Sequence, residues 1–363
     1  MVNGADVTQI TPFDTVRPGT EYRADRALSM AEMANLAYDG PAAIESKLKK
    51  TGFQLQSFFS VKGSQAGIFN SVDTQCFVAT KGDTVVLSFR GTDGLKDSFT
   101  DAAALFRDTV KVGTRETQVH RGFENALSAL EGRARDDRGR PLKVTKTNGT
   151  GRDPGSQDLS LHEEIRKLTE GPPRRKLYIT GHSLGAALAT IEAFNLTREG
   201  VPVESVYTIG SPRVGDPAFR DEYDKRLKDR TFRHVNYSDI VTRVPFDEDY
   251  VDVGLLRVPQ WLSKGLSKLH LNVEAGLYGP AQYRHVGTEK YIMSNGQLSP
   301  KVMGLSDQIS DFVESLQGMR FGVLTDHLSG NYVTALKKLV DAEKAAALKS
   351  PKVDSFVASK PPA

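Results

Sequence analysis

The sequence predicts an α/β fold with a mostly parallel central sheet flanked by helices. Short runs rich in β-branched and aromatic residues alternate with segments of helical periodicity along most of the chain. Several of these runs are followed directly by Gly, Ser or Asn, which are typical of loops at the ends of strands. With 39% hydrophobic and 26% charged residues the chain can build a sizeable core, so wholesale disorder is excluded.

The elements are expected in the following order. A first helix is predicted to begin at the capping-box spacing of Ser29 and Glu32, with Met33, Ala34 and Ala37 on one face. The Asp-Gly-Pro at 39–41 ends it. Strands are then predicted at 53–59, 75–79, 84–89, 176–180, 205–209 and 232–237.

The domain organisation is predicted as a single domain over 25–345, with an N-terminal extension at 1–24 and a flexible tail at 346–363. Two insertions are expected within the domain. The segment 133–158 has many basic residues, several Gly and Pro and almost no apolar residue, which indicates a solvated insertion. The second lies near 250–280.

Composition excludes several classes of protein. The 48 basic and 45 acidic residues leave a formal charge of only +3, so no nucleic-acid partner is expected. No apolar stretch approaches the ~20 residues of a transmembrane helix. Cys76 is the single cysteine, so no intramolecular disulfide can form. The first residues lack the pattern of a signal peptide, and the expected localisation is cytoplasmic or by leaderless secretion.

The most informative stretch is the Gly-His-Ser-Leu-Gly sequence at 181–185. A β-rich run enters it and an Ala- and Leu-rich run suited to a helix leaves it, which is the context of a nucleophile elbow. A sharp strand-to-helix turn holds the Ser183 hydroxyl out of the core, and the two glycines keep side chains away where strand and helix meet. The helix N-terminus presents unpaired backbone N–H groups, so the N–H of Leu184 is a candidate oxyanion donor.

The elbow pattern requires an acid and then a histidine downstream. Asp239 is the best acid, because it lies at the carboxyl end of the predicted strand 232–237. An aspartate at a strand end also commonly caps a turn. His285 and His327 are the two candidates for the base.

Four segments together resemble the fungal-type (class 3) lipase family. They are Ser-Phe-Arg-Gly-Thr at 88–92, Val-His-Arg-Gly-Phe at 119–123, Gly-His-Ser-Leu-Gly-Ala-Ala-Leu-Ala at 181–189 and Asp-Ile-Val-Thr-Arg-Val-Pro at 239–245. They occur in the family's order, and the resemblance covers roughly residues 25–340.

This resemblance implies an α/β-hydrolase fold and hydrolysis of carboxylic esters, especially acylglycerols and sometimes phospholipids. It implies that Thr92 completes the oxyanion hole through its backbone N–H and hydroxyl. The family's catalytic histidine resembles the Asp-His-Leu context of His327, whereas a histidine ahead of the aromatic strand, here His285, is structural. His182 is assigned to packing of the elbow and His120 to bracing a nearby loop. Surface or packing roles are expected for His162, His234 and His270.

The predicted site is therefore a Ser183–Asp239–His327 triad with Thr92 and Leu184 at the oxyanion hole. His327 would take the proton of Ser183 as an acyl-enzyme forms, and Asp239 would orient the imidazole. No His-Glu-x-x-His, paired-cysteine or Walker spacing is present, and no metal or organic cofactor is expected.

The leading functional hypothesis is a lipase that cleaves acylglycerols or related lipid esters. A phospholipase A1 is the alternative within the hydrolases, and a non-catalytic lipid-binding relative is a third. A peptidase with the same triad finds no support in the flanking motifs. The single cysteine, the segment 133–158 and the long gap between Asp239 and His327 depart from the secreted, disulfide-bonded fungal members.

Two amphipathic segments predict peripheral contact with a lipid interface. Leu95, Phe99 and Phe106 fall on one helical face at the place where the lipase family carries its lid. An ordinary amphipathic core helix is the alternative. A second segment has Trp261 and several leucines on one side and basic residues beside them, which suits a lipid surface.

Overall fold

The computed structural model describes most of the chain. Its described residues are 10–13, 16–63, 72–92, 109–111, 117–135, 140, 142–147, 160–237, 239, 241–243, 283–301, 303 and 327–349. The predicted lid segment, the segment around Trp261, His270 and most of the two predicted insertions lie outside these residues. The division into domains therefore stays a prediction.

An eight-stranded sheet forms the centre of the molecule, in the order β10-β9-β8-β7-β3-β2-β1-β6. Its strands are β1 (Gln54–Gly63), β2 (Val72–Lys81), β3 (Thr84–Phe89), β6 (Val144–Thr147), β7 (Lys176–His182), β8 (Val203–Ile209), β9 (Thr231–Asn236) and β10 (Thr288–Ile292). The run from β3 through β7, β8 and β9 to β10 is parallel, and β2, β1 and β6 are added antiparallel at the other side. The predicted α/β class with a mostly parallel sheet is confirmed.

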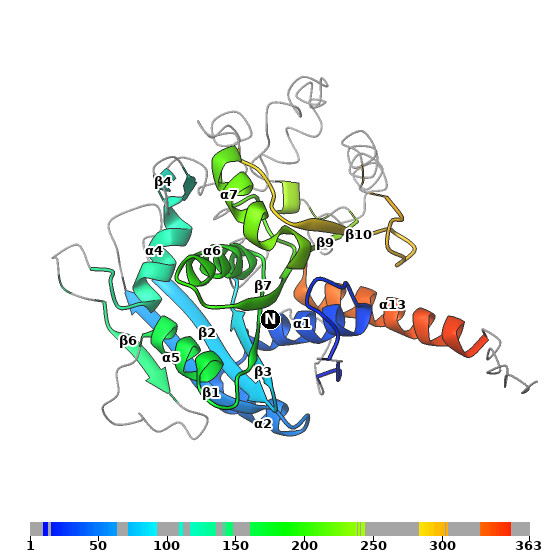
Figure 1. Ribbon diagram of the computed structural model, residues 1–363, viewed down its shortest axis with the longest axis horizontal. Helices are drawn as coiled ribbons and strands as arrows, with labels where there is room; N and C mark the ends of the chain where they lie inside the picture. The colour runs from blue at the N-terminus through cyan, green and yellow to red at the C-terminus, as the bar shows by residue number, and fades with distance from the viewer. Residues whose placement is uncertain are drawn as a thin grey trace, which may run out of the picture.

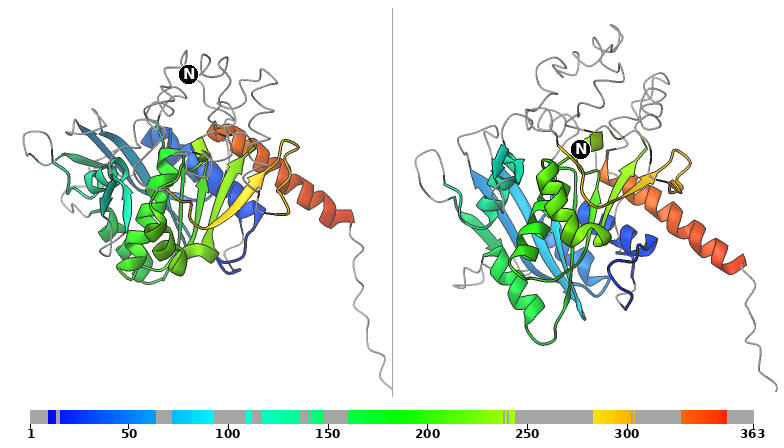
Figure 2. Two further views of the ribbon diagram at one scale, coloured as in Figure 1. Left: turned by 90° about the horizontal axis from the view of Figure 1, so that it is seen from above. Right: turned by 45° about the horizontal axis from the view of Figure 1, so that its top comes forward.

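Helices cover both faces of the sheet (Figures 1 and 2). One face carries α1 (Ala24–Leu36), α2 (Pro41–Lys49) and the first half of α13 (Ser329–Lys349), whose apolar residues form one core with the sheet. The other face carries α4 (Arg121–Leu130), α5 (Leu161–Glu170), α6 (Leu184–Arg198) and α7 (Pro217–Leu227). A short hairpin of β4 (Thr109–Lys111) and β5 (Gln118–His120) precedes α4.

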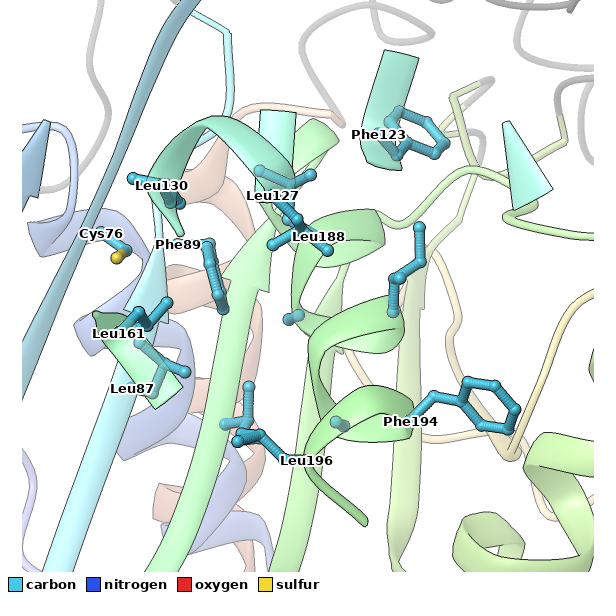
Figure 3. Close-up of a cluster of buried hydrophobic side chains, with 14 of the residues drawn as sticks. Cys76, Leu87, Phe89, Phe123, Leu127, Leu130, Leu161, Leu188, Phe194 and Leu196 are labelled. Atoms are coloured by element: carbon cyan, nitrogen blue, oxygen red, sulfur yellow. The ribbon is translucent and has the colours of Figure 1, made fainter. Parts of the chain in front are cut away.

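The core on the α4–α6 side is built around the helix that follows the predicted elbow. Figure 3 shows Leu188 of α6 beside Leu127 of α4 with Phe89 of β3 nearby, and Leu196 of α6 and Leu87 of β3 further along the same core. All five are fully buried, at 1% exposure or less. The alanines and leucines read as helix-forming in the sequence therefore also let α6 pack closely on the parallel strands.

The predicted start of the first helix is wrong. α1 begins at Ala24 rather than at Ser29, which is fully buried in the middle of the helix. Arg23 is the N-cap, and its side chain makes no capping hydrogen bond. Ala24, Ala27 and Leu28 are all buried, so burial of an extra apolar turn outweighs the local capping signal of Ser29.

The remaining sequence-based elements agree with the structure to within a few residues. Met33, Ala34 and Ala37 are buried as predicted. Each predicted strand overlaps an observed one, and β3 coincides with its prediction. The edge strand β6 lies inside the predicted insertion 133–158 and was not foreseen, because its alternating polar residues give a weak strand pattern.

The described residues contain no helix that is long and apolar enough to cross a membrane. Cys76 is buried in the core and, as the single cysteine, forms no disulfide within the chain. The predicted cytoplasmic or leaderless localisation stays a prediction.

Candidate active site

The elbow has the geometry that the sequence predicts. Ser183 stands between β7 and α6 with φ 58° and ψ −127°, a backbone conformation that a non-glycine residue rarely adopts. Its side chain is almost fully buried, at 3% exposure of the residue. The strain is held by the register on both sides, since Gly181 pairs with Phe89 and His182 with Ile209.

The two glycines of the elbow are required by close packing. A Cβ at Gly181 would collide with the backbone of Gly185, and a Cβ at Gly185 would collide with the carbonyl oxygen of Phe89. The partners are backbone atoms in both cases, so neither can move aside cheaply. The predicted reason for the Gly-x-Ser-x-Gly spacing is confirmed.

Ser183, His327 and Asp239 lie together at the carboxyl ends of the parallel strands. The Nε2 atom of His327 is 2.8 Å from the Oγ of Ser183. The Nδ1 atom of the same ring is 3.0 and 2.9 Å from the two carboxylate oxygens of Asp239. Because a carboxylate only accepts hydrogen bonds, Nδ1 carries the proton and Nε2 is free to accept the serine's proton. This is the arrangement of a nucleophile, a base and an orienting acid.

Asp239 is fully buried and is held by further donors. The hydroxyl of Tyr332 donates to its Oδ2 at 2.6 Å, and the backbone N–H of Val241 donates to its Oδ1 at 2.9 Å. Tyr332 in turn accepts from the backbone N–H of Asn236. These bonds stabilise the carboxylate away from water. Sequence reasoning missed Tyr332, and no local pattern in α13 marks it.

His182 supports the site from behind the elbow. Its Nε2 is 2.6 Å from the carbonyl oxygen of His327, and its Nδ1 is 2.7 Å from the hydroxyl of Tyr38. A carbonyl oxygen only accepts, so Nε2 is the protonated nitrogen and Nδ1 accepts from Tyr38. Burial and the neighbouring His327 hold the pKa of His182 well below its usual range, so the ring is neutral. The predicted packing role thus includes two hydrogen bonds.

The two predicted oxyanion residues flank Ser183. Leu184 is the first residue of α6, where backbone N–H groups have no partner within the helix. Thr92 is half-buried and directly follows Gly91, whose backbone lies so close to Ser183 that an added Cβ would be 3.2 Å from the serine Cβ. Their role as oxyanion donors stays a prediction.

The other described histidines are engaged away from Ser183. His285 is half-buried, and its Nε2–H donates to the carbonyl oxygen of Thr242 at 2.6 Å. Nδ1 of His120 accepts from the backbone N–H of Gly122 and caps α4. His234 is buried with its ring stacked beside Tyr207.

His162 lies in a group with two carboxylates, and its predicted surface or packing role stays a prediction. It is buried with Glu131 and Glu192, and these three residues are the group of potential metal ligands found among the described residues. Glu131 directly follows α4, His162 lies on α5 and Glu192 lies on α6. No local sequence pattern marks this group, because its members are far apart in the chain.

Part of the chain matches a known protein family. Residues 86–249 match the model of the family described as lipase (class 3). This segment belongs to the class 3 lipase family. It contains the elbow, Thr92 and Asp239 of the class 3 lipase pattern, and His327 lies beyond it.

Individual relatives match the class 3 lipase region over parts of their length. A chloroplastic phospholipase A(1), DAD1, of Arabidopsis thaliana is 34% identical over 114 residues, which cover 29% of this chain and 25% of that protein. A lipase of Rhizopus niveus is 29% identical over 207 residues, covering 55% of this chain and 44% of the relative. The matched segments thus span less than half of these relatives.

The crystal structure of a lipase from Rhizopus microsporus var. chinensis is similar in fold. Its TM-score is 0.52 at 19% identity, over 91% of this chain and 95% of that one. The predicted α/β-hydrolase fold is confirmed.

Proposed function

We propose that this protein is a serine carboxylester hydrolase, a lipase that cleaves acylglycerols or related lipid esters. The observation that supports it most directly is the continuous hydrogen-bonded series from Ser183 through His327 to Asp239. The class 3 lipase match of residues 86–249 supports the same chemistry.

In the proposed reaction, the Ser183 hydroxyl attacks the ester carbonyl carbon as Nε2 of His327 takes its proton. Asp239 stabilises the resulting imidazolium through Nδ1 and fixes the ring's orientation. The imidazolium then protonates the leaving alcohol oxygen as the ester bond breaks, and an acyl-enzyme remains on Ser183. His327 next activates a water molecule, which releases the carboxylic acid and restores the serine.

The negative oxygen of the tetrahedral intermediate needs donors placed in advance. We assign the backbone N–H of Leu184, and the backbone N–H and hydroxyl of Thr92, to this task. The loss of one such donor typically raises the barrier by ~3 kcal/mol. All these groups belong to the protein, and the proposed reaction uses no metal or organic cofactor.

Phospholipase A1 activity is the second candidate for the substrate class. It is supported by the similarity to the Arabidopsis phospholipase A(1), whereas the longer match to the Rhizopus lipase supports acylglycerols. Purified protein assayed side by side on tributyrin and on phosphatidylcholine separates them. Release of fatty acid from tributyrin at the higher rate supports the lipase, and faster release from the sn-1 position of phosphatidylcholine supports the alternative.

We also infer peripheral contact with lipid, on the sequence pattern of residues 95–106 and of the segment around Trp261. The rate is then expected to rise when the ester passes from monomers to droplets. Anionic vesicles are expected to shift the fluorescence of Trp261, the single tryptophan. A flat rate and unchanged emission would instead indicate an esterase for soluble substrates. No nucleic-acid partner is expected, because the charges are balanced.

The test of the proposed chemistry is Ser183→Ala. The variant removes only the nucleophilic oxygen and keeps both glycines of the elbow, so its circular dichroism should match that of the wild type. Loss of a triad nucleophile costs ~10⁶ in turnover. Ester hydrolysis above about a thousandth of the wild-type rate, after contaminating esterases are excluded, would overturn the assignment of Ser183.

A further inference from the structure

Three buried side chains meet between the helices that cover one face of the sheet. Glu131 directly follows α4, His162 lies on α5 and Glu192 lies on α6. One ligand atom from each lies within 4.8 Å of the other two. Nε2 of His162 is 3.0 Å from Oε1 of Glu192 and 3.8 Å from Oε1 of Glu131. This group, here called the α4–α6 cluster, lies outside the catalytic site.

Two atoms that face into the α4–α6 cluster have no hydrogen-bond partner. They are Nε2 of His162 and Oε1 of Glu192, whose residues are 8% and 1% exposed. The two atoms are 3.0 Å apart, which is an ion-pair distance when the imidazole is protonated, but their geometry is not that of a hydrogen bond. A buried polar atom without a partner is costly, by ~1–3 kcal/mol, and charged groups cost more. A cation, either a proton or a metal ion, is therefore needed between the two atoms.

The other ring nitrogen of His162 is hydrogen-bonded in the way that is typical of metal-binding histidines. Nδ1 of His162 is 3.1 Å from a carboxylate oxygen of Glu199, and Arg166 holds the same oxygen at 3.1 Å. Histidines that bind metals generally donate their other ring N–H to a carboxylate, which fixes the tautomer and aims the free nitrogen at the ion. Glu131 is fixed too, because its Oε1 accepts from the backbone N–H of His162.

We propose that the α4–α6 cluster binds one divalent transition-metal ion of the Zn²⁺ class through Glu131, His162 and Glu192. Bonds of 2.0–2.2 Å to nitrogen and oxygen in a tetrahedral arrangement separate ligand atoms by about 3.3 Å. The separations of 3.0 and 3.8 Å from Nε2 bracket that value. A water molecule would complete the coordination. An imidazole among the ligands favours Zn²⁺ over Mg²⁺ and Ca²⁺, which prefer oxygen alone.

The charges around the cluster also favour a cation. Glu131, Glu192 and Glu199 bring three carboxylates to one imidazole, and Glu124 of α4 is near enough to Glu192 to interact with it. Arg133 and Arg166 offset part of this charge, through Glu131 and Glu199. Glu192 has neither arginine as a partner and is the most deeply buried of the three.

The bound ion has a structural role. It would join the end of α4 to α5 and α6, which already share apolar contacts and the hydrogen bonds of His162 with Glu131 and of Arg166 with Glu199. Helix α6 begins immediately after Ser183. Glu192 lies eight residues after Leu184, about 12 Å along the helix at its usual rise. The ion is therefore too far along α6 to take part in ester cleavage.

The competing state is an ion pair without metal. Burial lowers the pKa of His162, but the carboxylates of Glu192, Glu131 and Glu199 outweigh it and raise the pKa to about 9. In this state a proton occupies the place of the ion. The two states differ in metal content and in their response to added Zn²⁺, and neither measurement depends on ester hydrolysis.

The first experiment measures metal in the wild type. Tag-free protein, purified without chelator, is analysed by mass spectrometry, and chelator-treated protein is titrated with ZnCl₂ by calorimetry and thermal unfolding. One Zn²⁺ per chain and a rise in Tm of about 5 °C or more near saturation are expected. No bound metal together with an unchanged Tm overturns the proposal in favour of the ion pair. Binding of Mg²⁺ as tight as that of Zn²⁺ overturns the assigned metal class.

Variants then locate the site. Glu192→Gln and His162→Gln each remove one ligand and should weaken Zn²⁺ binding at least 100-fold. Glu170→Gln is the matched control, because Glu170 is an exposed glutamate on α5 that pairs with the same Arg166. Its Zn²⁺ affinity should equal that of the wild type. Unchanged affinity in Glu192→Gln overturns the site.

A spectroscopic measurement on the wild type tests the site even if the ligand variants do not fold. Co²⁺ bound to the chelator-treated protein should show the intense visible absorption of a four-coordinate site, and Zn²⁺ should displace it. Only the weak spectrum of Co²⁺ in water would contradict the proposal.

Discussion

Tyr38 and His182 are joined by a hydrogen bond of 2.7 Å between the tyrosine hydroxyl and Nδ1 of the imidazole. His182 in turn fixes the backbone at His327, because its Nε2–H donates to the carbonyl oxygen of His327. The Gly91 N–H also interacts with the Tyr38 hydroxyl. One half-buried tyrosine after α1 thus connects the Gly91–Thr92 loop, the elbow and the loop of the proposed base.

We predict that Tyr38→Phe lowers kcat about tenfold and leaves KM almost unchanged. The change leaves Nδ1 of His182 without its donor, and the His327 loop loses part of its support. Because the Tyr38 hydroxyl contacts His182 and Gly91 rather than a triad residue, substrate binding should be spared. Steady-state kinetics on a soluble p-nitrophenyl ester, with kcat and KM separated, measures the effect.

Tyr223→Phe is the matched control for this prediction. Tyr223 is more deeply buried than Tyr38, and its hydroxyl bonds to Thr231 away from the site. Both variants should lose ~1 kcal/mol of unfolding free energy, and only the first should lose kcat. Equal kinetics in the two variants would show that Tyr38 is merely structural.

We predict that His327→Ala is as damaging as Ser183→Ala, whereas His285→Ala retains most of the activity. His327 is hydrogen-bonded to both the serine hydroxyl and Asp239. His285 instead donates its Nε2–H to the carbonyl oxygen of Thr242. Burial is the main cause that keeps the pKa of His285 well below its usual range, so its ring is neutral and structural.

The two histidine variants are compared in one assay, with unfolding curves to confirm that each is folded at the assay temperature. His285→Ala is expected to unfold more easily because it leaves a cavity and an unpaired carbonyl. An active His327→Ala beside a folded, inactive His285→Ala would reverse the assignment of the base.

Much of the site could be predicted from the sequence because its signals are local. The elbow needs two glycines around one serine between a strand and a helix, and that spacing can be read within 15 residues or so. The strand before Asp239 is likewise visible as a short run that contains aromatic and β-branched residues such as Phe232 and Val235. These patterns exist because backbone geometry demands them wherever the fold occurs.

The supporting contacts could not be predicted, because they join distant parts of the chain through a single polar atom. Tyr38 meets His182 across 144 positions and Tyr332 meets Asp239 across 93. Neither tyrosine differs in local pattern from a core tyrosine such as Tyr223. The wrong start of α1 has the opposite cause, since Ser29 carries a local signal that burial overrides.

We predict that Thr92→Val lowers kcat by about tenfold to a hundredfold with little change in KM. The substitution keeps the backbone N–H and the shape of the side chain and removes the hydroxyl, which would stabilise charge present mainly in the transition state. Steady-state kinetics measures it, and Thr92→Ser, which keeps the hydroxyl, should restore most of the rate. An unaltered rate in Thr92→Val would remove its hydroxyl from the oxyanion hole.

We finally predict that buried His234 makes the protein less stable in acid. Burial lowers the pKa of His234 to about 3, against 6.5 for the ordinary side chain. Between pH 6.5 and pH 3, this histidine is therefore protonated in the unfolded chain but neutral in the folded one. The free energy of unfolding is highest above pH 6.5 and falls as the pH drops toward 3. At pH 4.5 this single group removes about 3 kcal/mol of unfolding free energy. Denaturant unfolding at pH 7.5, 6.0 and 4.5 measures the loss, and His234→Asn should reduce it by about 3 kcal/mol although the variant is less stable at pH 7.5. The loss that remains belongs to other histidines such as His182 and His285, whose pKa values are also lowered. Phe232→Leu, a packing change on the same strand, should lower stability equally at all three pH values. A pH profile of His234→Asn parallel to that of the wild type would show that acid acts through other groups.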